Sequence, residues 1–259
     1  MVSAIKVLWK TVKDIWEDLL LLVLMNLLTV VCGLPLFAAL GIPVYLALAS
    51  AAPVPALIQA LIVGMALSIP ASLPYAAAWF ALNAICNRVA NGFAISWEYY
   101  FTNYKQSFFK AWAYMQFSNI VGILILVNYL WYPQAFPDQV WVPWIVGAWL
   151  AAGVFWIAIQ FYAFPFYIEQ EVKSWRIAFK NAALVAGANP LFTLVLLAVA
   201  ATLLALSIGF LPPLFILLGL LIWAMVGTQG VINRVAFYRQ RIAAAEEKTK
   251  TGGQNTRSQ

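Results

Sequence analysis

Residues 96–112, SWEYYFTNYKQSFFKAW, decide the architecture that the sequence predicts. In a helix, residues that recur at intervals of three and four positions share one face. The large aromatic side chains of this stretch recur in that way: Trp97, Phe101, Tyr104, Phe108 and Trp112. Polar and charged residues fall on the opposite side. The stretch therefore predicts an amphipathic helix that lies in the interface of a membrane.

The residues that follow, Met115 to Tyr132, are long and apolar enough to enter a bilayer. Over the whole chain of 259 residues, 64% are hydrophobic and 9% are charged. A soluble domain has about 25% charged residues. The composition predicts an all-α, polytopic membrane protein. The net charge of +6 lies in short basic groups between apolar blocks, which is typical of membrane loops and gives no indication of a nucleic-acid partner.

One membrane domain of six spans is expected over residues 1–233. The spans are expected at approximately 19–41, 56–85, 113–132, 143–166, 190–209 and 213–233. Residues 42–55 contain three prolines and no charge. Because proline disfavours a continuous helix, we expect an outer loop or a partly re-entrant segment there.

Three prolines also mark features of individual spans. The second span is expected to bend near Pro70 and Pro74. The fifth is expected to begin at Asn189-Pro190, a capping residue followed by the proline favoured at a first helical position. Residues 234–259 are expected to form a basic cytoplasmic tail, disordered from Thr249 onward because it is polar and contains glycine.

The positions of the basic residues support this count of spans. Of the 15 Lys and Arg residues, three precede the first span, three lie between the second and third, three lie between the fourth and fifth, and six follow the sixth. The other connections contain a single charged residue, Asp138. The positive-inside rule then predicts that both termini are cytoplasmic.

An internal repeat is visible on the cytoplasmic side. Ser96-Trp97, Phe101 and Asn103 match Ser174-Trp175, Phe179 and Asn181 at identical spacing. Residues 3–18 form a third amphipathic segment, which contains Trp9 and Trp16. We therefore expect three units, each an interfacial helix followed by a two-span hairpin. Parallel repeats of this kind occur in transporters, although any interfacial helix also favours aromatic residues.

Three stretches resemble a known family. They are PYAAAWFALN at 74–83, NYKQSFFKAW at 103–112 and YAFPFYIEQEVKSWRIAFKNAALVAGANP at 162–190. They resemble the YesL-like family (domain of unknown function 624) of bacterial integral membrane proteins. The resemblance covers most of the chain after Pro70 and the first span, whereas residues 41–70 are longer and richer in proline than the family pattern. It implies a bacterial inner-membrane protein that is often encoded beside carbohydrate-uptake and degradation systems, and it supplies no catalytic residues.

Groups that carry out chemistry are scarce. The chain has no His, the commonest base and metal ligand, and it has no zinc-ligand spacing, phosphate-binding loop or nucleophile elbow. Cys32 and Cys86 lie in different spans and are expected to be small buried side chains rather than a disulfide. No catalytic, metal or cofactor site is therefore expected. The central parts of the spans also lack charge, which is unfavourable for a proton-coupled transporter.

Neutral polar side chains and terminal arginines are the remaining candidates. The possible polar lining consists of Asn26, Gln59, Asn83, Gln116, Asn119, Asn128, Gln160 and Thr193. Such groups either hydrogen-bond a neutral solute or, more commonly, join helices at about 0.6 kcal/mol each. Arg234, Arg239 and Arg241 follow the last span. They are expected to face lipid, where they either bind anionic headgroups or fix the topology.

These features leave three hypotheses for the function. The first is a non-enzymatic accessory or subunit that contacts membrane lipids and other membrane-protein subunits, such as a transport complex. The second is a facilitator for a neutral solute such as a sugar, which requires the polar amides to converge on one cavity. The third is a membrane-bound transferase that uses Glu169 and Glu171. A solvated ion-pair role is sufficient to explain the presence of these two residues.

Overall fold

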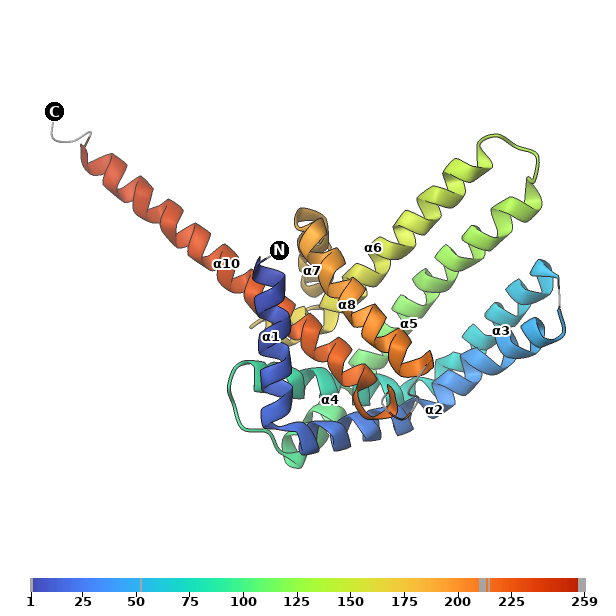
Figure 1. Cartoon of the computed structure of the whole chain (residues 1–259), viewed down its shortest axis with the longest axis horizontal. Coiled ribbons are helices and arrows are strands. Elements are labelled where there is room, and N and C mark those ends of the chain that lie inside the picture. Colours follow the sequence, from blue (N-terminus) through green and yellow to red (C-terminus); the bar gives the residue numbers. More distant parts are fainter. Residues whose placement is uncertain (1, 52, 210–212, 214, 256–259) are drawn as a thin grey trace.

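A computed structural model describes residues 2–51, 53–209, 213 and 215–255. Every regular element within those residues is a helix (Figure 1). Five helices are long and apolar enough to cross a membrane, and the bent pair α7–α8 provides a sixth candidate. The predicted all-α membrane protein is therefore confirmed at this level. The helices are α1 (Val2–Glu17), α2 (Leu19–Ala49), α3 (Val54–Ala71), α4 (Leu73–Ala90), α5 (Trp97–Ala135), α6 (Val142–Glu169), α7 (Trp175–Ala188), α8 (Pro190–Gly209), the π-helix η1 (Phe215–Gly219) and α10 (Leu220–Asn255).

The first difference from the sequence prediction concerns residues 42–55. Helix α2 continues through Pro35 and Pro43 to Ala49, so the expected loop or re-entrant segment is wrong over residues 42–49. Inside a membrane, neighbouring helices help to satisfy the backbone groups that a proline releases, so proline is tolerated there. The neighbour is α3, and a Cβ built on Gly64 of α3 would lie 3.2 Å from the carbonyl oxygen of Ala39.

The predicted bend in the second span is present as a complete break. Helix α3 ends at Ala71, and α4 begins at Leu73 with Pro74 in its first turn. The two halves have different surroundings. Most residues between Tyr75 and Cys86 of α4 are buried, whereas Gly64 and Ser68 are the buried residues of α3.

Two expected boundaries are absent. The interfacial helix expected at 96–112 and the span expected at 113–132 form one continuous helix, α5. No glycine or proline occurs between Trp97 and Val121, so nothing in the sequence interrupts it. Helix α10 likewise continues to Asn255, so the disorder expected from Thr249 is wrong up to that residue, and residues 256–259 lie outside the described range.

Other boundaries agree with the prediction. Helix α6 matches the expected fourth span closely. Helices α7 and α8 are separate and bent by 101°, with the new helix starting at Pro190 as expected. A residue that precedes proline disfavours the helical conformation, which explains the break at Asn189.

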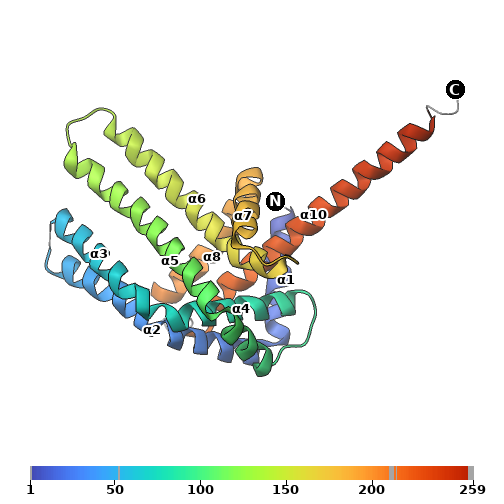
Figure 2. The same cartoon turned by 180° about the vertical axis from the view of Figure 1, so that it is seen from behind.

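The core and the periphery are clearly separated. Helix α10 packs against α1, α4 and α6, and its Gly227 allows the backbone of α6 to approach closely at Phe161. Two helix pairs extend away from this core, and we name them the α2–α3 arm and the α5–α6 arm (Figures 1 and 2). Their free ends lie on one side of the molecule, whereas the end of α10 lies on the opposite side.

Candidate functional site

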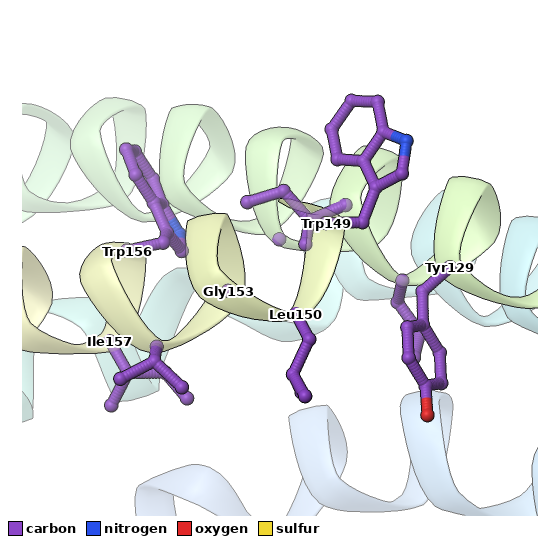
Figure 3. A pocket seen from close by; sticks show the side chains of 10 residues that line it. Tyr129, Trp149, Leu150, Gly153, Trp156 and Ile157 are labelled. Carbon is purple, nitrogen blue, oxygen red and sulfur yellow. The ribbon is translucent and has the colours of Figure 1, made fainter. Parts of the chain in front are cut away.

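An apolar recess lies between the two arms. It has a volume of about 560 Å³ and is lined by side chains of α2, α3, α5 and α6. A second recess of about 370 Å³ between α5 and α6 shares Gly122, Leu126 and Trp156 with the first. Figure 3 shows Tyr129, Leu150 and Ile157 projecting to the same side of the α5–α6 arm. We name the combined feature the inter-arm groove.

The walls of the inter-arm groove are almost entirely apolar. Its α2 and α3 side contains Phe37, Leu40, Gly41, Val44 and Leu61. Its α5 and α6 side contains Ser118, Asn119, Gly122, Ile123, Leu126 and Trp156. The Nδ2 atom of Asn119 is buried and has no hydrogen-bond partner among the described residues. Leaving such a donor unsatisfied costs about 1–3 kcal/mol. Because this atom is buried, an acceptor in the groove reaches it only after the Asn119 side chain rotates.

Asn26 is not part of this groove, although it was a candidate lining residue. It is fully buried, and its Nδ2 donates to the carbonyl oxygen of Ile216 at 2.7 Å. Its Oδ1 accepts from the backbone nitrogen of Leu221 at 2.8 Å. A π-helix shifts the backbone hydrogen-bond pattern by one residue, and this side chain satisfies groups at the junction of η1 with α10. Asn26 therefore joins two helices.

The amides of α4 and α5 mostly have partners close by. Asn83 and Asn128 each donate to a carbonyl oxygen four residues earlier in their own helix. Gln116 donates to the hydroxyl of Ser72 at the break between α3 and α4. Asn83 and Asn128 therefore bond within their own helices, whereas Gln116 joins α5 to the break between α3 and α4.

The remaining polar candidates lie elsewhere. The Oε1 atom of Gln160 accepts from the Tyr114 hydroxyl at 3.0 Å, and Thr193 accepts from Tyr162. Gln59 is exposed and lines a separate recess of about 410 Å³. The eight candidates are thus distributed over the helices, and the convergence that a solute facilitator requires is not observed in the described structure.

The aromatic residues of α1 face outward. Trp9 is 74% exposed and Trp16 is 76% exposed, whereas Ala4, Val7 and Thr11 are buried against the rest of the protein. An exposed tryptophan pair beside lysines is the arrangement expected for a helix that lies in a membrane interface.

The matching aromatic residues of α5 and α7 have different surroundings. Trp97 and Phe101 are partly exposed and stack with ring centroids 6.0 Å apart. By contrast, the ring of Trp175 lies between those of Tyr114 and Tyr167, with both centroid distances at 4.0 Å. Phe179 packs on Phe117 and Trp156. Trp175 and Phe179 of α7 therefore pack against α5 and α6, unlike the exposed tryptophans of α1.

The three terminal arginines also differ from one another. Arg239 and Arg241 are exposed, as expected. Arg234 was expected to face lipid, but it is only 7% exposed. Its guanidinium carbon lies 3.6 Å from the ring centroid of Phe192, and its Nη1 donates to Asn189 at 3.3 Å. A cation–π contact together with a hydrogen bond stabilises the buried cation.

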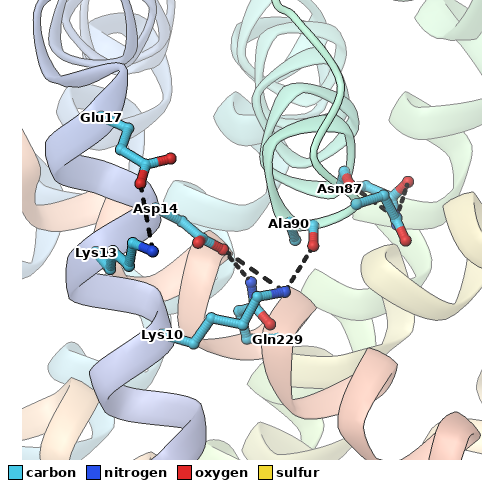
Figure 4. A network of polar contacts seen from close by, with 8 residues as sticks. Lys10, Lys13, Asp14, Glu17, Asn87, Ala90 and Gln229 are labelled. Carbon is cyan, nitrogen blue, oxygen red and sulfur yellow. Dashed lines mark hydrogen bonds and ion pairs between the residues drawn. The ribbon is translucent and has the colours of Figure 1, made fainter.

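A polar network joins α1 to α4 and α10 (Figure 4). Lys10 donates to the carbonyl oxygen of Ala90 at 2.8 Å and lies 3.9 Å from Asp14. Gln229 donates to the same carboxylate. Burial raises the pKa of Asp14 above its usual value, and this effect is larger than the opposing attraction of Lys10.

The acidic residues near the end of α6 act separately from this network. Glu169 accepts from Asn87 at 2.8 Å, while Glu171 is exposed. Among the described residues, no three His, Cys, Asp or Glu side chains come close enough to hold a metal ion. Cys86 is buried, Cys32 is half-buried, and both are free thiols.

Comparison of the chain with family models, with curated proteins and with solved structures finds no match. The resemblance to the YesL-like family therefore remains a sequence-based expectation. The inter-arm groove, which contains the unsatisfied amide of Asn119, is the candidate functional site.

Proposed function

We propose that the chain is a non-enzymatic accessory subunit that binds a transmembrane helix of another membrane protein in the inter-arm groove. The observation that supports this proposal most directly is the unsatisfied Nδ2 of Asn119 within apolar walls. Amide side chains commonly hydrogen-bond between helices inside membranes. A partner helix would supply the apolar surface and, once the Asn119 side chain has rotated toward the groove, an acceptor for this donor.

The shape of the groove also suits a helix. Gly41 and Gly122 border it, and a Cβ built on Gly41 would contact no atom within 4 Å. Small residues at such positions allow two helix backbones to approach closely. In the most apolar 18-residue segment of α5 only 6% of the residues are buried, and in the corresponding segment of α3 only 11% are buried. Much of their apolar surface is thus available to lipid or to a partner.

The proposed orientation places three hairpins in a bacterial inner membrane with interfacial helices and both termini in the cytoplasm. It is supported by the alternating positions of the 15 basic residues. The positive-inside rule relates such a distribution to the cytoplasmic face. The free ends of the two arms lie on the same side of the molecule in Figure 1, and the residues that connect the arm helices, 50–53 and 136–141, include no Lys or Arg.

The proposed partner is a component of a membrane complex, and the YesL-like resemblance suggests a carbohydrate-uptake system. The alternative is a facilitator for a neutral solute such as a sugar. It is less well supported, because the polar amides are distributed over several helices and most already have hydrogen-bond partners.

Gentle extraction from native membranes followed by native mass measurement tests the proposal. We expect a stoichiometric complex with one other membrane protein. Asn119→Leu removes the unsatisfied amide and should weaken that complex, whereas Asn128→Leu, whose amide bonds within its own helix, should not. A monomer or homo-oligomer in both the wild type and the variants would refute the accessory role, and solute-flux assays in vesicles would then test the alternative.

Crosslinking can locate the partner. A photo-crosslinking residue at Leu126, which lines the groove, should capture the same protein that co-purifies. The same residue at Leu124, which is 55% exposed and points away from position 126 in a helix, is the matched control. Equal capture from both positions would place the contact outside the groove.

A further inference from the structure

A separate crevice lies between α7 and α10 at the end of the molecule that carries the basic residues. Its volume is about 450 Å³, and Phe166 of α6 contributes to its wall. The α7 side contains Asn181, Leu184, Val185 and Ala188, and the α10 side contains Val235, Tyr238, Arg239 and Ile242. We name this feature the α7–α10 crevice.

The polar groups of the crevice suit a phosphate. Arg239 is exposed, and a guanidinium can donate two parallel hydrogen bonds to phosphate oxygens. The hydroxyl of Tyr238 accepts from Asn189 at 2.7 Å, which leaves its own proton free to donate. Asn181 adds an amide donor on the opposite wall. None of the lining residues is acidic, so nothing in the crevice repels an anion.

The apolar groups of the crevice suit acyl chains. Leu184 is 57% exposed and Ile242 is 59% exposed, so large aliphatic side chains form the rim. Val185 is nearly fully buried and lies deeper between the helices. An aliphatic surface beside one cation matches a molecule that carries a phosphate at one end and hydrocarbon at the other. A soluble phosphate compound would leave the aliphatic rim uncovered.

We propose that the α7–α10 crevice binds one anionic glycerophospholipid, with its phosphate at Arg239, Tyr238 and Asn181 and its acyl chains against Leu184 and Ile242. In the proposed orientation, the basic residues place this crevice at the cytoplasmic headgroup region, where anionic lipids attract juxtamembrane cations. Arg241 is the contrasting residue, because it lies outside the crevice and its guanidinium is 5.4 Å from the ring centroid of Phe237.

Native mass spectrometry of the purified full-length chain in detergent tests the proposal, with phosphatidylglycerol and phosphatidylcholine of identical chains as probes. We expect the wild type to retain one phosphatidylglycerol in preference to phosphatidylcholine. Arg239→Gln should weaken retention of phosphatidylglycerol about five-fold, the effect expected for one arginine near a membrane surface. Arg241→Gln removes the same charge and should leave retention unchanged.

Two further measurements distinguish the alternatives. Ala188→Trp fills the crevice without changing the charge and should also abolish the preference. Free glycerol 3-phosphate in excess should not displace the lipid, and displacement would instead indicate a site for soluble phosphates. Equal losses of phosphatidylglycerol retention in Arg239→Gln and Arg241→Gln would overturn the proposal, because they would indicate nonspecific electrostatic attraction between the basic residues and the lipid. These measurements use detergent and concern lipid retention, so their failure is distinct from failure of the proposed partner binding in the inter-arm groove.

Discussion

Replacement of Gly227 by alanine tests the close crossing of α10 with α6. A Cβ at this position would lie 2.6 Å from the carbonyl oxygen of Phe161. The obstacle is a backbone atom, so it cannot turn away as a side chain could. An ordinary contact starts at 3.4 Å, so the helices would have to separate by about 0.8 Å or deform, and such overpacking costs about 1–3 kcal/mol.

Part of this cost is offset by helix propensity. Alanine is favoured over glycine within a helix by about 1 kcal/mol, so the net change for Gly227→Ala should be a loss of about 0–2 kcal/mol. Gly147→Ala isolates the propensity term, because a Cβ there meets nothing within 4 Å. The free energy of unfolding of Gly147→Ala should therefore exceed that of Gly227→Ala by about 1–3 kcal/mol.

A third variant controls for position along the same helix. A Cβ on Gly230 would lie 3.0 Å from the end of the Leu196 side chain and 3.2 Å from a ring atom of Tyr162. Because side chains can move, Gly230→Ala should be less destabilised than Gly227→Ala. Reversible unfolding in mixed micelles of increasing dodecyl sulfate content measures all three variants. If Gly227→Ala is as stable as Gly147→Ala, the close crossing of α6 and α10 is refuted.

Three further predictions concern other contacts. Asn26→Leu leaves the backbone nitrogen of Leu221 without its acceptor, and unfolding in micelles should show a loss of about 1–3 kcal/mol. Trp175→Leu removes a ring stacked on Tyr114, and proteolysis at the α6–α7 connection should become faster. Burial raises the pKa of Asp14 in the folded state, so the native protein binds a proton more tightly than the unfolded chain does. Consequently, the stability of the wild type relative to Asp14→Asn should rise as the pH falls through that raised pKa, and it should level off below the usual aspartate pKa. Thermal unfolding of both proteins from neutral to acidic pH measures this difference.

The sequence predicted the helical membrane class and several breaks for identifiable physical reasons. Apolar length identified the spanning helices, and the prolines at 70, 74 and 190 marked breaks that the structure contains. The same reasoning failed at Pro43, where α2 continues. Inside a membrane protein, a proline breaks a helix only when no neighbouring group satisfies the backbone groups that the proline releases. A sequence pattern does not identify that neighbour.

The candidate site was less accessible to sequence reasoning. Asn119 was among the predicted polar residues, but its distinction from Asn128 depends on tertiary contacts, since one amide is unsatisfied and the other bonds its own helix. Arg234 was placed with the lipid-facing arginines because it follows an apolar segment. Its burial depends on Phe192 and Asn189, which are more than 40 residues away in the sequence.

The inter-arm groove arises because one long helix is interrupted and its neighbour is not. The chain breaks at Ser72, so α4 stays in the core while α3 joins α2. Helix α5 passes this break without interruption, and Trp112 Nε1 donates to the carbonyl oxygen of Ile69 at 2.8 Å. Gln116, one turn later, donates to Ser72. Asn119 follows after three more residues and already lines the groove. The two hydrogen bonds hold α5 at the break, so Asn119 lies in the part of the groove that is nearest to this break along α5.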